Sequence, residues 1–336
     1  MKCKVVGLLL LNILLSAVIV YAQTVNLPVI TGEIYKDNAG NVINAHGAGM
    51  LYHDSTYYLF GEIKKGETWF VLGQSWEDYR VPAGGVSCYS SNNLKHWKYE
   101  GVALSPVIGD SSNDLDTSKV IERPKVIYDS ANKKFVMWMH IDANDYSYSR
   151  AGVAVSDNPA GPYTYKGSVR PNGQMARDMT VFKDDDNKAY LIYSSENNNT
   201  MNICLLSKDY LSPTKTYSRI LIDKRREAPA MFKSEGKYYL ITSGCTGWSP
   251  NEASYAVAES PLGSWKELGN PCSGPGAETT FQSQSTFVLP VAGKPNTFLF
   301  MADRWNKTNL EDSRYVWLPL RVDKGKVVIK WAQAVK

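Results

Sequence analysis

The chain has 336 residues, a length that suits one large β or α/β domain or two ordinary domains. Hydrophobic residues make up 43% and charged residues 21%, which excludes a disordered or collagen-like chain. The net charge of +4 falls to +2, with 35 basic against 33 acidic residues, once Lys2 and Lys4 of the leader are set aside. This balance gives no electrostatic reason to expect nucleic acid or a membrane surface as a partner.

The first 22 residues are typical of a signal peptide. Lys2 and Lys4 precede an apolar stretch from Val5 to Val20, and Val20-Tyr21-Ala22 matches a small-x-small cleavage site. An uncleaved anchor is the alternative, but the apolar run is short for a membrane span. We therefore expect cleavage of residues 1–22, one domain over residues 23–336, and a secreted or periplasmic protein with no membrane contact after cleavage.

Four cysteines remain after the leader, at positions 88, 204, 245 and 272. They form no Cys-x-x-Cys pair or Cys/His cluster, so the sequence does not predict a zinc site. An exported protein can form disulfides. Disulfide pairing of Cys88, Cys204, Cys245 and Cys272, in any of three arrangements, and isolated buried thiols both remain open.

A hairpin pattern, two β-favouring runs separated by a turn, recurs five times. It occupies residues 46–60, 122–138, 177–193, 227–241 and 284–300. Aromatic residues make up 12% of the chain and are concentrated in the second runs. The strand-start positions 47, 122, 178, 227 and 284 are spaced by 75, 56, 49 and 57 residues. Such a repeat predicts an all-β chain folded as a five-bladed β-propeller, with a β-sandwich as the second choice.

Several short blocks occur in a characteristic order. They are residues 44–50, 60–62, 86–91, 120–127, 137–142, 176–178, 184–186, 226–229, 246–250, 283–284 and 303–305. Together they resemble glycoside hydrolase family 43, in particular its exo-β-1,3-galactanase branch, over nearly all of the mature chain. The resemblance implies a five-bladed propeller, an active site at one mouth of its axis, and inverting hydrolysis. Inversion needs an acid and a base whose carboxyl groups are roughly 6.5–9.5 Å apart.

Three carboxylates and one amide stand at the strand-start positions. Glu227 matches the general acid of the family, Asp178 the carboxylate that orients the acid, and Glu122 a substrate-binding glutamate of the galactanase branch. If these residues converge on the axis, the crowded carboxylates raise one another's pKa. The competing interpretation pairs each carboxylate with the arginine beside it in the sequence.

The first repeat departs from the family pattern. Most members place a general-base aspartate where this chain has Gly47, and the galactanase branch shares its absence. In that branch a glutamine matching Gln284 is implicated in handling the water. A neutral amide is a poor base, so Gln284 either acts as a rare tautomer or orients water beside Glu122. An ordinary polar strand residue is the remaining alternative for Gln284.

Weaker candidates for contacts with the sugar surround these positions. They are Glu62, Tyr146, Thr246, Trp248, His46 and Arg304. Trp248 either stacks on the apolar face of galactose or packs between blades. His46 and Arg304 can also be explained without a role in sugar binding. His46 is then a structural histidine whose hydrogen bonds are all made, and Arg304 forms an ion pair.

The leading functional prediction is an exo-acting, monomeric hydrolase that releases galactose from β-1,3-galactan chains of the arabinogalactan type. An arabinofuranosidase or β-xylosidase is the first alternative, and the missing aspartate argues against it. A catalytically inactive propeller that binds glycans is the second, and the presence of both Glu227 and Asp178 argues against that. We expect no metal or cofactor. The acidic run at residues 184–187 suggests calcium but lacks the later ligands of a calcium loop.

Overall fold

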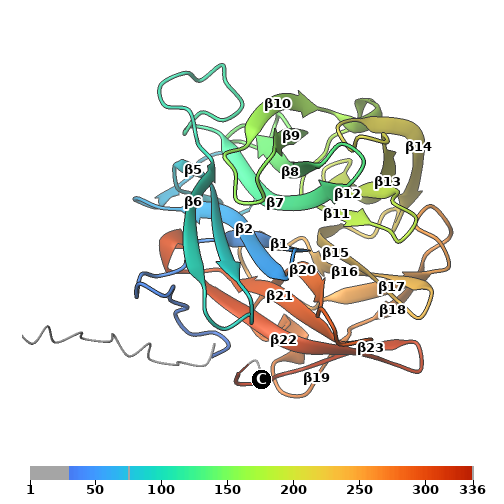
Figure 1. Cartoon of the computed structure of the whole chain (residues 1–336). Helices are drawn as coiled ribbons and strands as arrows, with labels where there is room; N and C mark the ends of the chain where they lie inside the picture. Colours follow the sequence, from blue (N-terminus) through green and yellow to red (C-terminus); the bar gives the residue numbers. More distant parts are fainter. Residues whose placement is uncertain (1–29, 75, 335–336) are drawn as a thin grey trace, which may run out of the picture.

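The computed structural model describes residues 30–74 and 76–334, so the predicted signal peptide lies outside the described residues. Five sheets, antiparallel except for one short outer strand of the fifth, surround a central axis and form a five-bladed β-propeller (Figure 1). Apart from strands, the described residues form only short 3₁₀ turns, at Pro171–Gly173, Ala277–Thr279 and Leu310–Asp312. In this part of the chain, no helix has the length and apolar character needed to cross a membrane.

Each of the first four blades has four strands. Blade one consists of β1 (His46–His53), β2 (Thr56–Lys64), β5 (Ala83–Ser91) and β6 (Lys98–Leu104). Between β2 and β5 a separate hairpin is formed by β3 (Trp69–Phe70) and β4 (Tyr79–Arg80). Blade two consists of β7 (Val120–Asp129), β8 (Lys134–Asp142), β9 (Arg150–Ser156) and β10 (Thr164–Val169). Blade three consists of β11 (Met179–Lys183), β12 (Ala189–Ser195), β13 (Thr200–Leu206) and β14 (Pro213–Ile220). Blade four consists of β15 (Arg226–Ser234), β16 (Lys237–Gly244), β17 (Ser254–Ala258) and β18 (Lys266–Gly269).

The fifth blade closes the ring. It consists of β20 (Gln284–Pro290), β21 (Phe298–Arg304), β22 (Arg314–Asp323) and β23 (Lys326–Lys330), with the short β19 (Cys272–Ser273) parallel to β23 at the outer edge. The innermost strands β1, β7, β11, β15 and β20 contact one another in turn, and β20 contacts β1. Near the chain ends, the amide of Thr31 donates to the carbonyl of Gln333 at 2.9 Å.

The core is divided into five hydrophobic clusters, each lying between two adjacent blades. Large side chains such as Trp97, Trp138 and Trp317 are fully buried in them. Trp97 and Tyr163 come from the turns between the third and fourth strands of blades one and two. The aromatic richness of the sequence therefore supplies the apolar area that holds the blades together.

The five predicted hairpins are the pairs β1–β2, β7–β8, β11–β12, β15–β16 and β20–β21. In blade one, the register of the strand pair differs from the predicted one. Glu122 lies opposite His140 and Glu227 opposite Ser243, and in blade one it is His46, not Gly47, that lies opposite the second strand at Glu62. A bulge follows each of these residues, so Gly47 occupies the bulge, with φ of 56°.

Candidate active site

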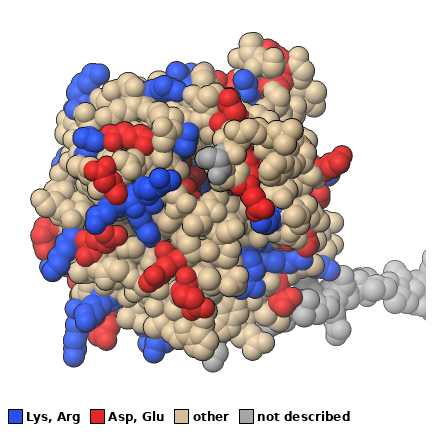
Figure 2. Space-filling model, turned by 180° about the vertical axis from the view of Figure 1, so that it is seen from behind, with Lys and Arg blue, Asp and Glu red and all other residues tan. Residues whose placement is uncertain are grey.

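One cavity of about 560 Å³ receives side chains from all five blades. It brings together eight of the ten predicted site residues: Glu62, Glu122, Tyr146, Asp178, Glu227, Thr246, Trp248 and Gln284. The face opposite to that of Figure 1 is hollowed, and acidic and basic groups are interspersed over it (Figure 2). The strand-start side chains of the separate sheets therefore meet in one site, as the repeat predicts.

Glu227 is held by amide donors. Its Oε1 accepts a hydrogen bond from Gln284 Nε2 at 3.0 Å, and its Oε2 accepts one from Asn198 Nδ2 at 3.0 Å. Burial raises the pKa of the Glu227 carboxyl well above its usual range, and the negative charge of Asp178 raises it further. A carboxyl with a raised pKa keeps its proton near neutral pH and can donate it to a leaving group.

Asp178 links blades two, three and four. Its Oδ1 pairs with Arg123 Nε at 2.8 Å, and its Oδ2 accepts a hydrogen bond from the amide of Ala228 at 3.0 Å. Ala228 directly follows Glu227, and its φ of 54° marks the bulge in β15. Asp178 therefore fixes the backbone that carries Glu227, and its partner is Arg123 of another blade and not the adjacent Arg177.

Glu122 is surrounded by donors. Tyr146 Oη lies 3.1 and 3.2 Å from its two oxygens, His140 Nδ1 lies 3.3 Å from Oε2, and Lys64 Nζ lies 3.6 Å from Oε1. Burial alone would raise the pKa of Glu122, but His140 and Lys64 hold it below its usual range. Glu122 is therefore a fixed anion that can accept hydrogen bonds from sugar hydroxyls.

His140 lies fully buried between two carboxylates. Its Nε2 is 2.9 Å from Asp142 Oδ2, on the side away from Glu122. Burial alone would lower the pKa of His140, but the hydrogen bonds to Asp142 and Glu122 raise it to about 9. An imidazolium at this place keeps Glu122 ionised.

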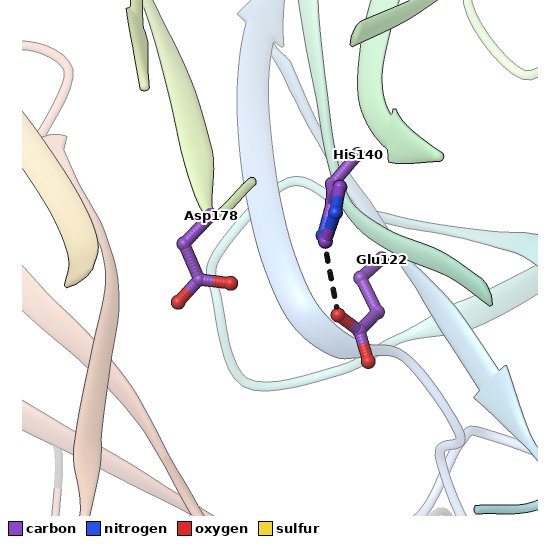
Figure 3. A group of neighbouring side chains, drawn as sticks. All are labelled: Glu122, His140 and Asp178. Atoms are coloured by element: carbon purple, nitrogen blue, oxygen red, sulfur yellow. Dashed lines mark ion pairs between the residues drawn. The ribbon is translucent and has the colours of Figure 1, made fainter. Parts of the chain in front are cut away.

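Figure 3 shows Glu122, His140 and Asp178. Each of them offers one atom that could bind a metal ion, a carboxylate oxygen or a ring nitrogen, and these atoms lie within 4.8 Å of one another. Such a group of donors is sufficient in number for a metal ion. Arg123 on Asp178 and Lys64 near Glu122 already supply positive charge at these carboxylates. We therefore describe the group as an ion-pair cluster.

Glu62 enters the cavity from the second strand of blade one. Its Oε2 lies 2.8 Å from Lys64 Nζ, and its Oε1 lies 2.4 Å from the point that a Cβ of Gly47 would occupy. Burial raises the pKa of Glu62, Lys64 lowers it, and the charge of Glu122 raises it, with a net rise above the usual range. The absence of a side chain at Gly47 is what makes room for this carboxylate.

Aromatic rings form part of the cavity wall. Trp248 and Trp305 meet edge to face, with ring centroids 5.1 Å apart, and Lys64 Nζ lies 5.5 Å from the Trp248 ring. Trp76, from the hairpin segment of blade one, also lines the cavity. Thr246 uses its hydroxyl to donate to the carbonyl of Ser249 at 2.6 Å. The site therefore combines charged groups with apolar ring faces, the combination typical of sugar-binding clefts.

His46 and Arg304 do not line the cavity. His46 is buried behind it, with Nδ1 3.2 Å from Asp303 Oδ1 and its ring stacked on Tyr315 at 4.9 Å. Arg304 donates to the carbonyl of Phe281 at 2.8 Å and lies over the Trp331 ring. Both residues hold neighbouring segments of the first and fifth blades.

Sequence reasoning did not identify several residues of the cavity wall. The sequence predicts Arg123 only as a partner of Glu122, and it carries no signal that places Asn198, Cys245 or Trp76 in the site. Trp305 and His140 belong to blocks that carry the family resemblance, which was the available signal for them. Trp76 and Asn198 lie on connecting segments, where no repeat or periodicity points to the axis.

Comparison with known proteins agrees with this geometry. The profile of the glycosyl hydrolases family 43 matches residues 41–289. A search of curated protein sequences found no match. A solved structure of a GH43 β-1,3-galactosidase with galactodeoxynojirimycin is 42% identical, covers 92% of this chain and 100% of its own, and has a TM-score of 0.84.

Two exo-β-1,3-galactanases are also similar. The enzyme from Phanerochaete chrysosporium, solved with β-1,3-galactotriose, is 37% identical over 92% of this chain and 68% of its own, with a TM-score of 0.83. The enzyme from Clostridium thermocellum is 38% identical over 92% of this chain and 66% of its own, with a TM-score of 0.80. Given the profile match over most of its length, the chain belongs to glycosyl hydrolases family 43.

Proposed function

We propose that this glycoside hydrolase removes galactose from the end of β-1,3-linked galactan chains and inverts the anomeric configuration. One observation carries the proposal: Glu227, with a raised pKa, shares a cavity with three carboxylates from other blades, Glu62, Glu122 and Asp178. The choice of sugar rests on the similar proteins, which are described as β-1,3-galactosidases and exo-β-1,3-galactanases.

In this mechanism Glu227 protonates the glycosidic oxygen as the bond to the anomeric carbon breaks. Asp178 and Arg123 keep the acid in place through the amide of Ala228. Glu122 accepts hydrogen bonds from sugar hydroxyls, and Trp248 offers a ring face to the apolar side of the sugar. Water attacks from the opposite face without an aspartate at position 47, where the chain has glycine.

We also propose that the enzyme is exported. The basic start of the chain, its apolar stretch and the cleavage site at Ala22 support removal of residues 1–22. A polysaccharide cannot cross a membrane unaided, so its degradation outside the cytoplasm fits a secreted or periplasmic enzyme.

The test is a substrate panel with the mature protein, using β-1,3-galactan, β-1,4-galactan, and aryl galactosides, xylosides and arabinofuranosides. We expect chromatography to show free galactose as the first product from β-1,3-galactan. NMR at early times should show that this galactose is the α-anomer. Release of xylose or arabinose in place of galactose would show that the proposed substrate is wrong. Binding of galactan without any hydrolysis would favour the glycan-binding alternative.

A further inference from the structure

Two of the arginines that line the cavity have no acidic partner. Arg123 pairs with Asp178, but Arg177 and Arg225 form no ion pair with any carboxylate of residues 30–74 or 76–334. Basic side chains lie at the edge of the hollow in Figure 2. An arginine without an acidic partner keeps its positive charge and its fork of N–H donors available for an anion.

Arg177 is held in place but keeps one terminal nitrogen free. Its Nη2 donates to the carbonyl of Tyr146 at 3.0 Å and to Asn197 Oδ1 at 3.1 Å, and its Nε donates to Ser149 Oγ at 3.3 Å. Nη1 makes no hydrogen bond to the described residues. These contacts fix the guanidinium at the cavity wall in advance, so that little side-chain freedom is lost when a ligand binds.

Arg225 reaches the same place from the start of blade four. It is exposed, and its guanidinium makes no hydrogen bond to the part of the chain that the structure describes. Its backbone is fixed instead: its amide donates to the carbonyl of Asn199 at 3.5 Å, and its carbonyl accepts a hydrogen bond from Cys245 Sγ at 3.1 Å. Arg177 and Arg225 are therefore both bound to one turn, residues 196–199 between β12 and β13.

The same turn holds the acid of the proposed mechanism. Asn198 donates to Glu227 Oε2 at 3.0 Å, and Glu227 marks the bond that is cleaved. In an exo-acting enzyme the terminal galactose fills the inner end of the cavity, and the rest of the chain extends toward solvent. Glu227 is half-buried, whereas Asn197 and Arg225 are exposed. The two arginines therefore lie toward the departing part of the chain.

Acidic groups near the turn do not neutralise these arginines. Glu196 pairs with Arg219 at 2.6 Å, and Asp223 accepts a hydrogen bond from Asn199. The hydroxyls of a neutral galactan could use the donors of a guanidinium but not its charge. A carboxylate uses both, because its two oxygens match the fork of donors.

We infer that Arg177 and Arg225 bind the carboxylate of a uronic acid attached to the galactan chain beyond the cleaved bond. The inference rests on the proposed function and makes acidic galactans the preferred substrates. The 1,3-linkage leaves the primary hydroxyl at O6 of each galactose free, so this position can carry the uronic acid. The two charges hold the departing part of the chain while Glu227 protonates the linkage.

The test compares two galacto-oligosaccharides that differ only in charge. One carries a glucuronosyl unit at O6 of the galactose that follows the terminal one, and the other carries the same unit with its carboxyl reduced to a hydroxymethyl group. We expect the wild type to cleave the acidic compound with a kcat/KM about tenfold higher, mainly through a lower KM, because hydrogen bonds between charged groups are the stronger ones. The ratio should fall toward one in about 0.5 M salt, which screens exposed charges.

Arg225→Gln should lower this ratio, and Arg225→Glu should reverse it, because a carboxylate at this position repels the acidic compound. Arg321→Gln, at an exposed arginine of β22 outside the cavity, is the matched control and should keep the ratio. A wild-type ratio within about twofold of one, or a ratio that Arg225→Glu leaves unchanged, would overturn the inference. A wild type that releases galactose from neither compound would instead refute the proposed function.

Discussion

At the scale of single residues, Glu227 differs from the other acidic groups of the cavity. Among the described residues, no lysine or arginine forms an ion pair with it, and both its oxygens face amides. The other carboxylates lie beside cations: Asp178 beside Arg123, and both Glu62 and Glu122 beside Lys64. Without an ion-pair partner, Glu227 has a pKa that burial raises well above its usual range, whereas His140 and Lys64 hold the pKa of Glu122 below its usual range.

The first prediction concerns the leaving group. Glu227→Gln should reduce hydrolysis of β-1,3-galactan by about 10²–10⁴-fold, because an unprotonated sugar alkoxide is a poor leaving group. The loss should be much smaller for an aryl galactoside with an acidic phenol, which needs little protonation. Steady-state kcat/KM for both substrates checks the prediction, and equal losses would show that Glu227 does not act as the acid.

The second prediction concerns His140 and its pH dependence. The folded-state pKa of about 9 lies above the usual value near 6.5, so protonation of His140 stabilises the fold. The stabilisation is complete below about pH 6.5 and is lost as pH rises through about 9. The free energy of unfolding should therefore fall over this range by roughly 2–4 kcal/mol more in the wild type than in His140→Gln.

Urea unfolding at several pH values between 6 and 9.5 measures this difference. His96→Gln is the matched control, since His96 is half-buried beside Asn93, away from the carboxylates of the cavity. If wild type and His140→Gln lose stability in parallel as pH rises, His140 is not charged in the folded protein.

The sequence predicted the site residues that lie on strands better than those on connections. Glu122, Asp178, Glu227 and Gln284 could be found because the repeat places them at equivalent positions of consecutive blades. The pairing of Arg123 with Asp178 could not, because it joins two blades whose relative rotation no local pattern encodes. His46 and Arg304 are close in sequence to cavity residues but turn away from the cavity.

At the scale of the strand, the bulges after His46, Glu122 and Glu227 determine where the site side chains point. Each bulge inserts an extra residue with positive φ, at Gly47, Arg123 and Ala228. The sequence alone predicted the strands but not these insertions. His46 is therefore in register with Glu122 and Glu227, while the Cβ position of Gly47 faces Glu62 in the cavity.

The third prediction concerns the close approach of β2 to the segment before β1. A Cβ at Gly61 would lie 2.1 Å from the carbonyl carbon of Ala45, a backbone atom that cannot rotate away. Gly61→Ala should therefore lower the free energy of unfolding by about 3 kcal/mol or more, at the upper end of overpacking effects. Gly244→Ala is the control, because its nearest neighbour is the Asn251 side chain at 3.3 Å. Similar stability of the two variants in urea would contradict the packing argument.

At the scale of the whole molecule, the ring is closed by both ends of the described chain. Ile30 forms a β-bridge with Ala334, and the amide of Gly32 donates to the carbonyl of Tyr315 at 2.8 Å. Val327 and Ile329 of β23 are buried in the cluster between blades four and five. The propeller could be predicted from the five repeats, but this closure could not, because the segment near residue 30 has no hairpin pattern of its own.

The last prediction concerns the start of the mature protein. Cleavage after Ala22 would remove the basic and apolar leader but leave Ile30, Thr31 and Gly32, which close the ring. Amino-terminal sequencing of protein from the native host should therefore begin at or within a few residues of Gln23. Ala22→Trp should block cleavage, because the site requires a small residue there, and should leave the protein on the membrane with its leader. Wild-type protein that still reads from Met1 would contradict export by this route, while the ring and its cavity would be unaffected.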